Sequence, residues 1–171
     1  MQTMVMKMNH EIRHSERSDI EGLRSLHAQR SCYSNTLQLP FPSLDLWEKR
    51  SQEIPEGLIS LVAIVNDRVI GQIGFEVDAN PRRKHVANFG MVVAEDCRGD
   101  GIGSSLVEAM LDVCGNWLAV RRIELQVYTD NQNAIGLYEK HGFAIEGTAR
   151  EYAFREGGFA DVHFMAKLLK Q

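Results

Sequence analysis

One stretch of this chain, residues 86–114, most constrains its fold, because it reads as a strand, a glycine-rich turn and a helix in direct succession. Residues 86–93 form an apolar, β-branched run of strand length. Residues 94–97 interrupt the run, and three glycines follow at positions 99, 101 and 103. The apolar residues after the turn recur at the spacing of one helix face: Ile102, Leu106, Val107, Met110, Leu111 and Cys114.

The glycine cluster is an unfavourable start for a helix, because each glycine loses much backbone freedom on folding. It is expected where the chain turns sharply and a ligand comes close to the backbone. The first amide groups of a helix lack hydrogen-bond partners and carry partial positive charge, so such a turn can bind a phosphate or pyrophosphate. Arg98 adds a full positive charge and forked donors beside it. A tight turn that binds nothing is the alternative.

Three glycine motifs can be compared with this turn. A P-loop requires Gly-Lys-Ser/Thr at its end, and no lysine follows here. The dinucleotide pattern Gly-x-Gly-x-x-Gly/Ala fails at Ser104, although Glu124 lies at a suitable distance downstream. The pattern Arg/Gln-x-x-Gly-x-Gly/Ala is matched by Arg98, Gly101 and Gly103. This last pattern resembles the coenzyme A loop of the GNAT acetyltransferases.

Length, charge and cysteine content limit the classes of protein to consider. With 171 residues the chain can form one complete core, and we expect a flexible terminus over residues 1–10 and one domain over residues 11–171. A net charge of −4 argues against nucleic-acid binding, and no apolar run approaches the ~20 residues of a membrane span. The three scattered cysteines form no C-x-x-C pair, which suggests free thiols in a reducing cytoplasm. The six histidines form no metal-binding motif, so no metal is expected.

The remaining hydrophobic patterns predict an α/β fold. Strands are expected at residues 11–13, 58–65, 68–77, 86–93, 122–128, 143–153 and 159–168. A helix is expected after a capping box of Ser18 and Glu21, a second over residues 43–53, and a third over residues 134–141 with Asn133 as its N-cap. The order of hairpins, strands and helices predicts one mixed, mostly antiparallel sheet of about seven strands with helices on both faces.

A second motif strengthens the resemblance to the GNAT family. Residues 131–143 read Asn-Gln-Asn-Ala-Ile-Gly-Leu-Tyr-Glu-Lys-His-Gly-Phe, which resembles the family signature Asn-x-x-Ala-x-x-Leu-Tyr-x-x-x-Gly-Phe. The motif follows a predicted strand about thirty residues after the glycine turn, and the likeness covers residues 11–167. Other short segments look like the bacterial YhhY-type N-acetyltransferases: 85–90, 114–118 and 146–148. The resemblance implies an enzyme with a single-domain GNAT fold and acetyl-CoA as its cosubstrate.

The resemblance also assigns roles to residues at matching positions. Met91, Val92 and Val93 match the strand whose backbone pairs with the pantetheine arm, and Asn131 matches an asparagine that contacts the coenzyme. The pyrophosphate loop is matched by Arg98, Gly99, Asp100, Gly101, Ile102, Gly103 and Ser104. Tyr138 matches the tyrosine near the thioester sulfur. Helical spacing predicts that this tyrosine faces inward, so a purely structural role is the alternative.

Direct acetyl transfer to an amine defines the catalytic groups to expect. The reaction needs proximity, loss of a proton from the amine and a proton for the departing sulfur. Tyr138 is the candidate acid, and backbone amides near Val92 could polarise the thioester carbonyl. Glu124 and His85 are the candidate bases, with a surface salt bridge or solvation as the alternative for both. Further candidate bases are Glu76, Asp78 and Asp161.

Two segments are expected to surround the acceptor amine in this fold, residues 33–41 and 152–159. They carry few carboxylates and offer mainly apolar and aromatic side chains: Tyr33, Thr36, Leu37, Tyr152 and Phe154. An α-amine with a pKa near 8 needs little help from a base. The expected acceptor is therefore a small apolar or aromatic amino acid, with a protein N-terminus or lysine, or a non-catalytic coenzyme A sensor, as alternatives. Exposed aromatic side chains at a sheet edge would also suit a homodimer.

Overall fold

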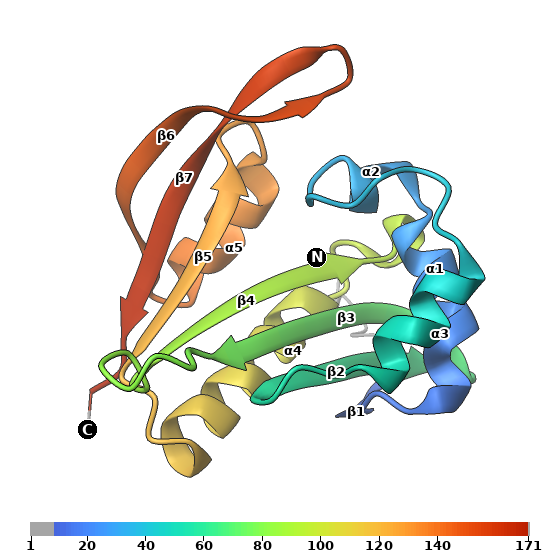
Figure 1. Cartoon of the computed structure of the whole chain (residues 1–171), viewed down its shortest axis with the longest axis horizontal. Coiled ribbons are helices and arrows are strands. Elements are labelled where there is room, and N and C mark those ends of the chain that lie inside the picture. The colour runs from blue at the N-terminus through green and yellow to red at the C-terminus, as the bar shows by residue number, and fades with distance from the viewer. Residues whose placement is uncertain (1–8, 171) are drawn as a thin grey trace, which may run out of the picture.

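The computed structural model describes residues 9–170, which form one seven-stranded sheet with the order β1-β2-β3-β4-β5-β7-β6 (Figure 1). The strands are β1 (Glu11–His14), β2 (Leu58–Val65), β3 (Arg68–Val77), β4 (Val86–Val93), β5 (Arg122–Tyr128), β6 (Ala144–Arg155) and β7 (Gly158–Leu168). Neighbouring strands are antiparallel except β4 and β5, which run parallel. The predicted mixed, mostly antiparallel sheet is confirmed. Of the terminus predicted to be flexible, residues 1–8 lie outside the described residues.

Helices cover both faces of this sheet, as predicted (Figure 1). They are α1 (Ile20–His27), α2 (Arg30–Tyr33), α3 (Leu44–Gln52), α4 (Ile102–Asp112) and α5 (Gln132–Lys140). α1 and α3 pack together on one face, whereas α4 crosses β3 on the other. A Cβ on Gly71 of β3 would meet Leu106 Cδ1 of α4 at 3.0 Å, so this glycine lets α4 pack directly on the strand. None of the helices in the described part of the chain is long and apolar enough to cross a membrane.

The start of α1 differs from the predicted capping box. A 3₁₀ turn, Arg17–Asp19, precedes the helix, and Glu16 and Asp19 form the box. The Glu16 amide donates to Asp19 Oδ2 at 2.7 Å. The prediction that Ser18 caps this helix is wrong, because Arg13 of β1 fixes the buried Asp19 carboxylate with hydrogen bonds of 2.7 and 2.9 Å. The helix start is therefore set by the Glu16–Asp19 box together with the ion pair from Arg13 of β1.

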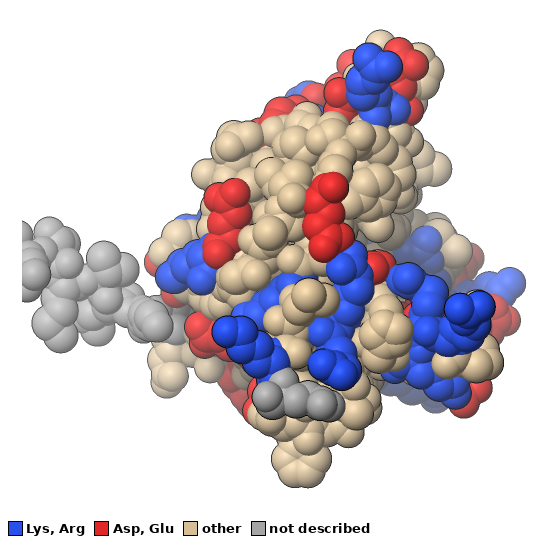
Figure 2. Space-filling view, turned by 90° about the vertical axis from the view of Figure 1, so that its left-hand side faces the viewer, with Lys and Arg blue, Asp and Glu red and all other residues tan. Residues whose placement is uncertain are grey.

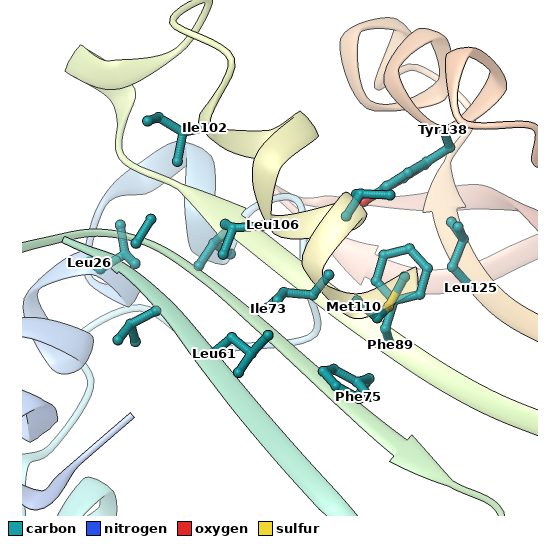
Figure 3. Packing of buried hydrophobic residues seen from close by; sticks show 14 of the residues in the cluster. Leu26, Leu61, Ile73, Phe75, Phe89, Ile102, Leu106, Met110, Leu125 and Tyr138 are labelled. Carbon is teal, nitrogen blue, oxygen red and sulfur yellow. The ribbon is translucent and has the colours of Figure 1, made fainter. Parts of the chain in front are cut away.

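The hydrophobic core extends from the space between α4 and the sheet to α5 (Figure 3). Leu106, Met110 and Ile73 are fully buried and lie close together in it. Phe89 of β4 meets the ring of Tyr138 at a centroid distance of 5.5 Å. Burial of each such side chain contributes about 1.5–3 kcal/mol. The core thus fixes the position of α5, which carries the candidate acid, relative to β4.

The pairing between β4 and β5 is short. Only residues 86–88 of β4 pair with residues 122–124 of β5, and the two strands diverge beyond Asn88 (Figure 1). β4 stays paired with β3 up to Val93, and β5 stays paired with β7 up to Tyr128. The sheet is therefore continuous at one end of its two central strands and open at the other.

Candidate active site

A cavity of about 800 Å³ occupies the place where β4 and β5 separate. Its walls come from both strands, the glycine turn with the start of α4, α5, and α2 with the residues that follow it. The predicted coenzyme-binding residues that line it are Met91, Val92, Val93, Arg98, Gly99, Gly101, Ile102, Gly103, Ser104, Asn131 and Tyr138. Asp100 belongs to the same turn but does not line the cavity. The fold thus brings two motifs that are distant in sequence to one cavity.

The turn between β4 and α4 has a backbone conformation that glycine permits. Gly99 and Gly101 have φ angles of 88° and 84°, in the left-handed region that disfavours residues with a Cβ. Gly101 is the N-cap of α4, and the first helical hydrogen bond runs from the Ser105 amide to the Gly101 carbonyl at 3.0 Å. The three amides before Ser105 have no partner within the helix. They belong to residues that line the cavity, where they can bind an anion.

α4 and α5 approach each other closely beside this turn. A Cβ on Gly103 would meet Leu137 Cδ2 at 3.0 Å and Met91 Cε at 3.5 Å. Gly103 therefore allows this close packing, and a larger residue would displace the Leu137 side chain. Lys140 lies about one helical turn after Leu137 and also lines the cavity. Its ammonium group was not predicted to belong to the site, since no motif position marks it.

Arg98 links the turn to α2. Its Nη2 donates to Ser31 Oγ at 2.7 Å, and its Nε and Nη2 both lie 3.4 Å from the Val93 carbonyl oxygen. The Ser31 amide donates to Glu95 Oε1 at 3.0 Å, which holds the pKa of Glu95 below its ordinary value. Ser31 and Cys32 line the cavity. They were not predicted because the sequence of α2 has neither a motif nor a clear period.

Tyr138 lies at the boundary between the core and the cavity. Its ring packs on Phe89 and on Phe143, with centroid distances of 5.5 and 6.0 Å. Its hydroxyl has no hydrogen-bond partner within residues 9–170, although the residue lines the cavity. Burial raises the pKa of Tyr138 to about 12. The phenol is therefore protonated at neutral pH and can donate to a group in the cavity.

Asn131 begins α5 and lines the cavity. Its Oδ1 accepts a hydrogen bond from the Ala134 amide at 3.3 Å, which makes it the N-cap. The prediction of Asn133 as the N-cap is wrong, because the helix starts two residues earlier than expected, at Gln132. Asn133 lies in the first turn of α5, exposed, and also lines the cavity.

The two predicted bases lie outside this cavity. Glu124 Oε1 accepts from Arg122 at 2.5 Å, and its Oε2 accepts from Arg83 at 3.0 Å. His85 is exposed in the turn immediately before β4. Among the described residues that line the cavity there is no Asp, Glu or His, and the two charged groups are Arg98 and Lys140. The geometry therefore does not support direct proton transfer from Glu124 or His85 to a group in the cavity, and the further candidate bases do not line it either.

A second group of lining residues, which we call the hairpin wall, comes from the segment after α2, from β5 and from the β6–β7 hairpin. Its members are Asn35, Thr36, Leu37, Gln126, Tyr128, Tyr152 and Val162. Thus Thr36, Leu37 and Tyr152 line the cavity, as expected for residues near an acceptor, whereas Tyr33 and Phe154 do not. Gln126 and Tyr128 were not predicted, although the alternation of β5 already placed them on the polar face of that strand.

Other reactive groups in the described part of the chain have ordinary structural surroundings. Cys32, Cys97 and Cys114 are buried and form no disulfide. Burial raises the pKa of all three thiols, in the case of Cys114 to about 12, which leaves them poor nucleophiles. Within residues 9–170 no group of three or more His, Cys, Asp or Glu side chains is placed to hold a metal ion.

Comparison with known proteins places this site in a family. The model of the Acetyltransferase (GNAT) family matches residues 25–143, which include the glycine turn and α5. The chain belongs to this family. This chain is 45% identical over 157 residues to the L-amino acid N-acetyltransferase AaaT of Escherichia coli K12. The alignment covers 92% of this chain and 96% of that relative.

Solved structures of GNAT acetyltransferases share its fold. A GNAT acetyltransferase from Streptococcus pneumoniae superimposes with a TM-score of 0.82 at 28% identity, covering 95% of this chain and 100% of that one. Spermidine N-acetyltransferase from Vibrio cholerae, solved with CoA and spermine, gives a TM-score of 0.82 at 28% identity over 93% and 95% of the two chains. The protein is thus an N-acetyltransferase of a family that takes its acetyl group from acetyl-CoA.

Proposed function

We propose that this GNAT acetyltransferase transfers the acetyl group of acetyl-CoA to the α-amine of a small free amino acid with an apolar or aromatic side chain. The observation that carries the proposal is the composition of the cavity. One wall offers a glycine turn and two cations, and the hairpin wall is uncharged and partly aromatic. The similarity to a relative named as an L-amino acid N-acetyltransferase supports the same acceptor class.

The residues around the glycine turn fit the coenzyme. In this proposal the pyrophosphate binds the unpartnered amides of residues 102–104, with Arg98 and Lys140 as counter-charges. The backbone of residues 91–93 pairs with β3 on one side only and lies beyond the last β4–β5 pair on the other. The groups on that second side, apart from the Val93 carbonyl that Arg98 contacts, are available to hydrogen-bond the amide groups of the pantetheine arm. Bound acetyl-CoA supplies an activated acetyl thioester to the cavity.

Tyr138 and β4 are proposed to act on the reacting atoms. The amine nitrogen forms a bond to the acetyl carbon, the carbon–sulfur bond breaks, and the amine proton passes to water. A backbone amide near Val92 stabilises negative charge on the acetyl oxygen. The Tyr138 hydroxyl donates a hydrogen bond to the departing sulfur, since it has no partner in the protein and stays protonated at neutral pH. An α-amine with a pKa near 8 is partly neutral at pH 7, so the missing carboxylate base is tolerable.

The charge of the cavity favours an amino acid over a polyamine. A polyamine carries several positive charges, which need carboxylates to compensate them when they leave water. The lining residues supply none. An apolar side chain gains about 0.8 kcal/mol for each CH₂ group that it buries. Leucine-, methionine- and phenylalanine-like acceptors should therefore exceed glycine and alanine by ten- to a hundredfold in efficiency.

A homodimer in the cytoplasm completes the proposal. Strand β6 ends the sheet and exposes Ile145 and Phe154, and Phe159 of β7 is exposed beside Phe154. Figure 2 views the side of the molecule where β6 lies at the edge and has a broad uncharged area above acidic and basic side chains. An unpaired edge strand with apolar side chains is a suitable surface for a second copy. Light scattering on the purified protein measures its mass in solution directly.

The test is a thiol-release assay with acetyl-CoA and a panel of acceptors. The panel contains the twenty amino acids, spermidine and a short peptide, and a reaction without acceptor gives the rate of thioester hydrolysis. We expect apolar and aromatic amino acids to give the highest kcat/KM. A tenfold advantage of spermidine or the peptide would overturn the acceptor assignment and leave acetyl transfer intact. Tight coenzyme binding with no transfer to any acceptor would favour the non-catalytic sensor.

A further inference from the structure

A free amino acid brings a carboxylate that the hairpin wall does not balance. All seven members of that wall are uncharged. Burying a carboxylate without a partner is costly, so the enzyme needs a cation near the acceptor. Arg98 and Lys140 belong to the part of the cavity assigned to the coenzyme phosphates. A different cation must therefore serve the acceptor, and this inference rests on the function proposed above.

Arg155, at the end of β6, contacts the hairpin wall. Its Cζ lies 4.1 Å from the centroid of the Tyr128 ring. Its Nη1 lies 3.1 Å from the Ser34 carbonyl oxygen and 3.5 Å from Asn35 Oδ1. Tyr128 and Asn35 both line the cavity. The guanidinium is thus in contact with two lining residues. Arg155 itself lines a second pocket, together with Asp130 and Glu156, and its side chain is only 19% exposed.

The partner that neutralises Arg155 can be exchanged. Nη2 donates to the carboxylate of Asp130, which is 65% exposed. An ion pair with so exposed a partner contributes little to stability, because water competes for both charges. A guanidinium has five N–H donors and binds carboxylates in a fixed, two-point geometry. The hydrogen bonds of Arg155 in the structure use Nη1 and Nη2, so its Nε–H is also available to a second carboxylate.

We propose that Arg155 binds the α-carboxylate of the acceptor amino acid beside Tyr128 and Asn35, either in place of Asp130 or together with it. The group recognised is the carboxylate itself, which every free amino acid carries and a polyamine lacks. Arg155 is then a specificity-determining residue, because it binds the carboxylate that distinguishes a free amino acid from other primary amines. The competing explanation is that Arg155 only holds the segment after α2 against β5 and β6.

Arg30 offers a matched control for that structural explanation. It also joins α2 to the hairpin, through a hydrogen bond to Glu156 at 3.0 Å. Its side chain is 75% exposed, and its hydrogen bonds go to Glu156 rather than to a residue that lines the cavity. Removing Arg30 therefore weakens the same junction without removing a charge from the acceptor. The hairpin tip lies close to α2 in Figure 1, where both arginine links are formed.

The test compares the best amino acid of the acceptor panel with its carboxamide, which keeps the side chain and loses the charge. We expect Arg155→Gln to lower kcat/KM for the acid at least tenfold more than for the amide, and Arg155→Lys to restore part of the difference. Arg30→Gln should change both substrates by the same factor. Because each ratio compares variants on one substrate, the lower amine pKa of the amide cancels.

Equal losses for acid and amide in Arg155→Gln would overturn the carboxylate assignment and leave the proposed function standing. If the wild-type enzyme acetylates no amino acid, the proposed function fails, and the assignment of Arg155 fails with it. Melting temperature and acetyl-CoA affinity, measured on every variant, show whether the fold and the coenzyme site are intact. If Arg155→Gln does not fold, Arg155→Met, which also removes the charge, carries the same comparison of acid and amide.

Discussion

Removal of one hydroxyl, in Tyr138→Phe, tests the proposed catalytic role most directly. The pKa of Tyr138 is about 12 because its ring is buried, and an ordinary thiol has a pKa of about 8.5. With the cysteine thiol as the reference, complete proton transfer from the phenol to a thiolate would be unfavourable by about 3.5 pKa units, or about 5 kcal/mol. Tyr138 therefore stabilises the departing sulfur by a hydrogen bond and does not hand over its proton.

A hydrogen bond to a charged group contributes about 1.5–3 kcal/mol, which corresponds to about a 10- to 150-fold change in rate. We expect kcat to fall by that factor at saturating substrates, with acetyl-CoA affinity unchanged. The hydroxyl has no partner in the described protein, so the free energy of unfolding should change by less than about 0.5 kcal/mol. Steady-state thiol release, calorimetry with acetyl-CoA and thermal unfolding measure the three quantities.

Several results would refute this reasoning. A kcat within twofold of wild type would make Tyr138 structural, as would weaker coenzyme binding with normal turnover. A wild-type rate profile with an alkaline limb below pH 10 that disappears in Tyr138→Phe would contradict the raised pKa. A loss far above 150-fold would indicate complete proton transfer and therefore a lower phenol pKa in the loaded site.

Three further predictions follow from described contacts. Arg98→Ala should raise the acetyl-CoA dissociation constant at least tenfold, about 1.4 kcal/mol, and unchanged affinity by calorimetry would remove Arg98 from the phosphate site. Glu124→Gln should leave the midpoint of the kcat/KM pH profile in place, because Glu124 is paired with arginines outside the cavity; a shifted midpoint would restore it as the base. The Arg13 guanidinium lowers the pKa of Asp19, so this pair stabilises the fold above the ordinary carboxyl pKa of about 3.9 and is lost as pH falls below it. Asp19→Asn should therefore cost about 1–3 kcal/mol at pH 7 and flatten the acid limb of the unfolding curve, and an unchanged limb would contradict this.

Regular strands and family motifs could be predicted from the sequence, because their signals are local. The bounds predicted for the strands at residues 58–65, 68–77, 86–93 and 122–128 agree with β2, β3, β4 and β5. Each is an apolar or alternating run bounded by turn residues. The glycine turn and α5 could be predicted for the same reason, because each motif lies within one short segment of the chain.

Features that depend on distant partners could not be predicted. The pairing of Glu124 with Arg83 spans 41 positions. The same holds for Arg155, whose contacts with Ser34 and Asn35 span 121 and 120 positions. Long polar side chains reach partners that no period or motif identifies. The cavity wall made by α2 was missed because four residues carry too little pattern.

The early end of the β4–β5 pairing has a mechanical consequence. Strands β1 to β4 form one slab and β5, β7 and β6 form another, and in the sheet only three residue pairs join the slabs directly. We therefore expect each slab to be stiff and the distance between the outer ends of β4 and β5 to vary most. A ligand that lies along β4 and contacts α5 would fix the distance between the two slabs. Its binding also stabilises the folded protein, by about 2.7 kcal/mol at a ligand concentration of one hundred times the dissociation constant. Slower amide exchange in the outer halves of β4 and β5 would report how strongly each ligand restricts the motion between the two strands.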